Sequence, residues 1–118
     1  MRSPPPNYGR FDSEQKALQA VVERLIDTLH PLSIYLFGSR AEERARPDSD
    51  FDLVVVLDDE APNSDVDYDE VYAPLLDMDI GCDVIPCRGS VFRKILQDPT
   101  NPWQTSWSSA KRVYGQSA

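Results

Sequence analysis

Two aspartates one residue apart, Asp50 and Asp52, open an apolar run at residues 51–57 that is dense in valine. Such a run predicts a strand. Alternate side chains of a strand share a face, so both carboxylates project from the same side. Two adjacent carboxylates repel, and keeping both charged is costly without a cation between them. The pair therefore predicts a site for a hard divalent ion, most plausibly Mg²⁺, because such ions prefer oxygen ligands.

A second apolar run, at residues 32–37, leads into a Gly-Ser-Arg segment at residues 38–40. Ten residues separate Ser39 from Asp50. The run is apolar on both faces, which predicts an interior strand. Glycine lets the backbone turn sharply, and a short helix from Ser39 to about Arg44 would present amides to a phosphate. Phosphate donors beside metal-binding carboxylates are the equipment of phosphoryl or nucleotidyl transfer.

The motif Gly38-Ser39-x10-Asp50-x-Asp52 resembles the signature of the DNA polymerase beta-like nucleotidyltransferases. It is most similar to the minimal nucleotidyltransferase (MNT) subgroup, small prokaryotic proteins often encoded beside a HEPN-domain toxin. The resemblance covers roughly residues 13–114, and it implies an α/β fold with a small mixed sheet of three to four strands flanked by helices. Five neighbouring positions also fit the family's usual sequence: Arg40, Ala41, Pro47, Asp48 and Ser49.

The resemblance implies roles for particular residues. Asp50 and Asp52 would hold two Mg²⁺ ions, and Asp83 would complete the metal site and help to deprotonate an acceptor hydroxyl. Asp83 lies in a predicted strand at residues 80–86, where a lone charged aspartate is costly to bury unless it is paired or metal-bound. Nucleotide binding is implied for four further residues: Gly38, Ser39, Arg40 and Ser49. A surface position for the arginine is the alternative.

For MNT relatives the implied reaction is transfer of AMP from ATP to a tyrosine of the HEPN toxin, which is thereby silenced. An antitoxin that acts by binding and occlusion is one alternative. Glu42 and Glu43 favour it, since they stand where the family often has Arg and Gly, and acids that point toward a phosphate loop weaken triphosphate binding. Transfer to a small molecule such as an aminoglycoside is a third possibility, although those enzymes usually carry an added helical domain.

The length of 118 residues suits one domain, and we expect residues 1–11, with three prolines, to form a flexible arm before a domain at 12–118. A net charge of −8 argues against nonspecific binding to nucleic acid or anionic membranes. We find no apolar run of about 18 residues, so the cytoplasm is the expected location. Cys82 and Cys87 are expected to be reduced core thiols.

Periodicity and capping residues predict the helices. Residues 13–29 form one amphipathic helix, and residues 66–78 form a short or kinked helix at Pro74, after an acidic loop. Ser90 is expected to cap a helix at 91–97, and residues 107–112 to form a last helical turn. Two tryptophans four residues apart are expected to pack in the core or an interface, with stacking on a nucleobase as the alternative: Trp103 and Trp107.

Overall fold

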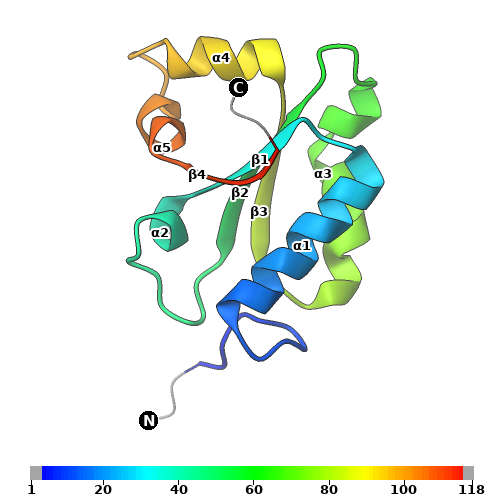
Figure 1. Ribbon diagram of the computed structural model, residues 1–118, viewed down its shortest axis with the longest axis vertical. Helices are drawn as coiled ribbons and strands as arrows, with labels where there is room; N and C mark the ends of the chain where they lie inside the picture. The colour runs from blue at the N-terminus through cyan, green and yellow to red at the C-terminus, as the bar shows by residue number, and fades with distance from the viewer. Residues whose placement is uncertain (1–3, 116–118) are drawn as a thin grey trace.

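The computed structural model of the protein describes residues 4–115, and its four strands form one open sheet in the order β3-β2-β1-β4 (Figure 1). The strands are β1 (Ser33–Phe37), β2 (Phe51–Leu57), β3 (Cys82–Arg88) and β4 (Lys111–Gly115). β1 pairs antiparallel with both β2 and β4, whereas β2 and β3 are parallel. The sheet is therefore mixed, which confirms the predicted α/β class with a small mixed sheet.

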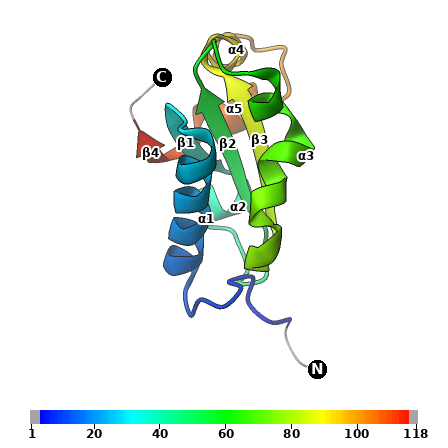
Figure 2. The same ribbon diagram turned by 90° about the vertical axis from the view of Figure 1, so that its right-hand side faces the viewer.

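Helices α1 (Glu14–Leu29) and α3 (Tyr68–Tyr72) lie on one face of the sheet (Figure 2). The side chain of Ser13 accepts a hydrogen bond from the amide of Lys16 and caps α1. The apolar stripe of α1 packs against this face of the sheet, where it joins alternate residues of β2 and β3 in one hydrophobic cluster. The buried members from these three elements are Ala17, Val21, Val22, Leu25, Phe51, Leu53, Val55, Leu57 and Val84.

Helices α4 (Gly89–Leu96) and α5 (Gln104–Ser108) supply the core of the opposite face, called here the α5 face. This second cluster consists of Phe37, Val54, Val56, Cys87, Phe92 and Trp107. Leu53 and Val55 belong to the first cluster, whereas Val54 and Val56 belong to the second. Because strand residues alternate, Asp52 shares the side of Val54 and projects onto the α5 face.

Two predicted helical segments have different outcomes. Residues 66–78 divide into α3 and a 3-10 helix, η2 (Ala73–Met78), with Pro74 in its first turn, which confirms the predicted kink. The predicted helical turn over residues 107–112 is wrong, because α5 ends at Ser108 and Lys111 begins β4. The chain pairs there with β1, and this long-range pairing outweighs local helix preference.

The capping role predicted for Ser90 is also wrong. Helix α4 begins at Gly89, and its N-cap residue, Arg88, makes no side-chain capping hydrogen bond. The amide of Ser90 instead donates a hydrogen bond of 2.9 Å to the carboxylate of Asp59, which comes from the loop after β2. That loop also contains a 3-10 helix, η1 (Asn63–Val66). Within the described residues, no helix is both long and apolar enough to cross a membrane.

Candidate active site

The Gly-Ser turn lies directly against the second of the two aspartates. β1 ends at Phe37, which is the cross-strand partner of Asp52. Gly38 then takes a φ of 73°, a conformation that favours glycine, and begins the single-turn helix α2 (Gly38–Ala41). A Cβ atom on Gly38 would collide with the carboxylate of Asp52. Glycine is therefore needed here for both its backbone angle and its lack of a side chain.

The structure brings Asp83 to the same place. Asp52 and Asp83 are partners in the register of the parallel strands β2 and β3, and each is the second residue of its strand. Register partners in adjacent strands point to the same face. Asp50 is exposed just before β2, and a Cβ atom on Gly81 would collide with its carboxylate oxygen. All three predicted acids thus lie where β2 and β3 begin.

The carboxylates influence one another electrostatically. Burial, followed by the charges of Asp83 and Asp50, raises the pKa of Asp52 above its usual value. Burial and then the charge of Asp50 also raise the pKa of the Cys82 thiol to about 11. Asp52 is therefore a half-buried anion next to two other anions, which is unfavourable unless positive charge joins them.

The arrangement suits a metal ion that is shared with a substrate. Among residues 4–115, no group of three or more His, Cys, Asp or Glu side chains is placed to hold one ion. Proteins usually bind Mg²⁺ through one or two carboxylates together with substrate phosphates. Asp52 and Asp83 supply such a pair of hard oxygen ligands, so their chemistry fits Mg²⁺. Joint metal binding by Asp50, Asp52 and Asp83 stays a prediction.

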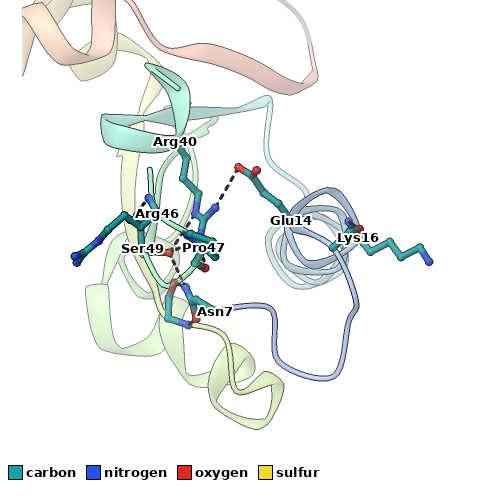
Figure 3. A network of polar contacts seen from close by, with 9 residues as sticks. Asn7, Glu14, Lys16, Arg40, Arg46, Pro47 and Ser49 are labelled. Carbon is teal, nitrogen blue, oxygen red and sulfur yellow. Dashed lines mark hydrogen bonds and ion pairs between the residues drawn. The ribbon is translucent and has the colours of Figure 1, made fainter. Parts of the chain in front are cut away.

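Arg40 does not lie on the surface, because its side chain is only 2% exposed. Its guanidinium donates to the carbonyl oxygen of Ser49 at 2.6 Å and 3.1 Å and to that of Pro47 at 3.0 Å (Figure 3). It also forms an ion pair of 3.2 Å with Glu14 and lies 4.1 Å from the ring centre of Phe51. Arg40 therefore fixes the loop that leads into Asp50, and its role in nucleotide binding stays a prediction.

Ser39 and Ser49, two other predicted nucleotide-binding residues, lie in α2 and in the loop before Asp50, respectively. The hydroxyl of Ser49 accepts a hydrogen bond of 3.0 Å from the amide of Arg46 and so stabilises the turn before β2. Ser39 is half-buried in the first turn of α2, one residue after the glycine that touches Asp52. Nucleotide binding by Ser39 and Ser49 stays a prediction, but only Ser39 belongs to the turn beside the carboxylate.

Asn7 supports the site, although nothing in the sequence around it distinguishes it from the rest of residues 1–11. Its side-chain amide donates to the carbonyl oxygens of Ser49 at 3.0 Å and Gly81 at 2.8 Å, and its oxygen accepts from the amide of Gly81 (Figure 3). Asn7 thereby joins the loop before β2 to the residue before β3. These are the two segments that position Asp50 and Asp83.

Glu42 and Glu43, which directly follow α2, are exposed. Glu42 forms an ion pair of 2.8 Å with Arg44, and Glu43 forms one of 3.6 Å with Lys111. Their side chains are 51% and 84% exposed, and each charge has a basic partner. This weakens the argument from Glu42 and Glu43 for an antitoxin that acts by occlusion. Acids in solvent with basic partners oppose a bound triphosphate less than buried acids do.

Comparison with known proteins identifies the family of the chain. The family model described as polymerase beta nucleotidyltransferase matches residues 19–87, which include the Gly-Ser turn and all three aspartates. A crystal structure of a Sulfolobus solfataricus protein, provisionally described as a nucleotidyltransferase, aligns at 20% identity with a TM-score of 0.46, covering 65% of this chain and 68% of that chain. The comparison with curated proteins gives no match. The chain belongs to the polymerase beta nucleotidyltransferase family.

Proposed function

We propose that the chain transfers a nucleotide from a nucleoside triphosphate to a hydroxyl group, in a reaction that depends on Mg²⁺. The observation that carries this proposal is the register pairing of Asp52 with Asp83, beside a glycine whose missing side chain leaves room at the carboxylate. Family members generally use a nucleoside triphosphate and a divalent metal ion. The half-buried, mutually repelling carboxylates supply the negative charge that such an ion neutralises.

Each group has a defined task in the proposed reaction. Ser39 and the adjacent amides bind the outer phosphates. Asp52 and Asp83 would hold the Mg²⁺ ion, which would supply positive charge to the triphosphate and lower the pKa of the acceptor hydroxyl. Asp83 helps to accept the proton of the acceptor hydroxyl. The acceptor oxygen then forms a bond to the α-phosphorus while the bond from the α-phosphorus to the bridging oxygen breaks, and pyrophosphate leaves. The protein contributes mainly position and charge.

At the finer level, we propose an MNT antitoxin that transfers AMP from ATP to a tyrosine of a HEPN toxin in the cytoplasm. The Gly38-to-Asp52 motif supports this assignment through its resemblance to that subgroup. Cys82 and Cys87 are unpaired thiols in the structure, which fits a reducing compartment. The net charge of −8 favours a protein acceptor over a nucleic acid, because polyanions repel each other.

The proposal is tested by incubating the protein with a HEPN partner, labelled ATP and Mg²⁺, and locating the label by mass spectrometry. We expect one or more AMP groups on a partner tyrosine, and loss of labelling with Asp83→Asn. Asp27→Asn is the matched control, because Asp27 is an exposed acid on α1, away from the site. Neutralisation of the toxin that survives in Asp83→Asn would instead identify an antitoxin that acts by occlusion.

A further inference from the structure

A series of stacked aromatic rings lies on the same face of the sheet as the carboxylates. Tyr35 stacks on Phe92 at 5.2 Å, Phe92 on Trp107 at 5.7 Å, and Trp107 on Trp103 at 5.4 Å, all measured between ring centres. Phe92 and Trp107 are almost completely buried, whereas Trp103 at the end of the series is 40% exposed. The series thus ends in an indole with open surface.

One face of Trp103 is open for a further ring. Trp107 covers the other face, with an angle of 17° between the two indole planes. The ring of Phe37 is 5.8 Å from Trp103 and 6.2 Å from Trp107, at angles of 78° and 65°. A ring that is steeply inclined to two stacked rings and nearly equidistant from them stands beside the pair. Neither Trp107 nor Phe37 therefore covers the outer face of Trp103, and the residue keeps 40% exposure.

Phe37 also connects this indole to the site. It is the cross-strand partner of Asp52, and such partners lie about 5 Å apart. Trp103 contacts one side of Phe37, and Asp52 lies beside Phe37 in the adjacent strand. Phe37 and Asp52 both project onto the α5 face, and Gly38 follows Phe37 directly. The indole and the candidate phosphate turn thus both adjoin Phe37.

We propose that the open face of Trp103 binds the base of the nucleotide whose phosphates occupy the Gly38 turn. This inference rests on the proposed function and names a subsite within it. Stacking on an aromatic ring accepts every base, since each base has a π face, so the subsite binds nucleoside triphosphates without reading their base edges. Buried rings behind Trp103 hold the indole in place, so little freedom is lost when a base stacks on it.

The experiment measures calorimetric dissociation constants for Mg·ATP and for Mg·tripolyphosphate, which has the phosphates but no base. Trp103→Ala is expected to weaken ATP binding about tenfold and to leave tripolyphosphate binding within about twofold. Trp103→Phe keeps a flat ring and is expected to restore most of the ATP affinity. Tyr68→Ala is the matched control, because Tyr68 is an aromatic residue of α3 with 47% exposure, on the other face of the sheet.

The two ligands separate failure of this inference from failure of the proposed function. Equal ATP affinity in the unaltered protein and Trp103→Ala, with tripolyphosphate still bound, overturns the base subsite alone. Failure of the unaltered protein to bind either ligand overturns the proposed function and the subsite with it. An equal loss of both ligands in Trp103→Ala, with a lowered melting temperature, assigns Trp103 to packing and also overturns the subsite.

Discussion

Asp52 pairs in register with Asp83 across the parallel strands β2 and β3, and the pKa of Asp52 is raised by its burial and then by the charges of Asp83 and Asp50. The basic residues whose ion pairs the structure describes (Lys16, Arg24, Arg40, Arg44, Arg46 and Lys111) pair with other acids. The protein therefore holds repelling charges together at a cost in stability. Sites that bind a cation commonly have this property, because the ligand supplies the missing charge.

Replacing Asp52 is expected to increase stability and abolish activity. In Asp52→Asn, the half-buried charge is removed while the shape is kept, so the melting temperature at pH 7 should rise by a few degrees. The same change removes a proposed metal ligand, so nucleotidyl transfer should fall by at least about 100-fold. Thermal melting and a transfer assay on the same preparations check both expectations. A lower melting temperature in Asp52→Asn would contradict the account of the site's electrostatics.

The pH dependence of this stability difference has a definite sign. A folded-state pKa above the unfolded value of 3.8 means that the charged form of Asp52 opposes folding. The penalty is fully present above the raised folded-state pKa, and it disappears as the pH falls from that value toward 3.8. The advantage of Asp52→Asn should therefore be largest at neutral pH and shrink on acidification. Comparing the two proteins at each pH cancels the titration of acids that do not interact with Asp52.

Gly38→Ala tests the turn that faces Asp52. The added methyl group would meet the carboxylate, and alanine at a φ of 73° is strained by about 1–2 kcal/mol. We expect a loss of free energy of unfolding of at least that size and a loss of most transfer activity. Gly89→Ala is the matched control, since Gly89 has no positive φ and its nearest neighbour is the flexible side-chain end of Arg93. Chemical denaturation and transfer assays distinguish the two variants.

The parts of the fold that the sequence predicts depend on local pattern. The valine-rich run at Phe51–Leu57 forms β2 with the expected bounds, because β-branched residues and alternating burial act within the segment itself. The convergence of Asp83 with Asp50 and Asp52 was expected from the resemblance to the family, and the parallel register of β2 and β3 produces it. The resemblance thus predicted a contact between strands that local propensity does not reveal.

The features that the sequence did not predict depend on distant partners. Nothing local shows that Arg40 is buried, since its position is decided by carbonyl groups at Pro47 and Ser49 and by Glu14 on α1. Irregular loops near a core need donors for such carbonyls, and a guanidinium supplies several at once. Strand β4 was likewise missed, because its residues are mostly exposed and its pairing with β1 joins distant segments.

Replacing Arg40 is expected to destabilise the loop before Asp50. Arg40→Met removes the charged hydrogen bonds to the carbonyl oxygens of Pro47 and Ser49 and the ion pair with Glu14, so the free energy of unfolding should fall by about 3 kcal/mol. Arg40→Lys should recover only part of this loss, because an ammonium cannot match the guanidinium fork. The matched control is Arg46→Met. The side chain of Arg46 is 80% exposed and forms an ion pair with Asp48, so this substitution should lower the free energy of unfolding by less than about 0.5 kcal/mol. Urea denaturation measures all three.

Removing the side chain of Asn7 is expected to loosen the loop before β2 and the start of β3 together. Asn7→Ala deletes two donors and one acceptor that Ser49 and Gly81 use, at a cost of about 1–3 kcal/mol. The amide of Gly81 should then exchange its hydrogen faster, and affinity for Mg·tripolyphosphate should fall, because Asp50 and Asp83 lose their common support. Pro5→Ala is the matched control, since Pro5 is exposed in the same segment. Unchanged exchange at Gly81 in Asn7→Ala would show that β3 is held without Asn7, and truncation of residues 1–11 would then also leave the site intact.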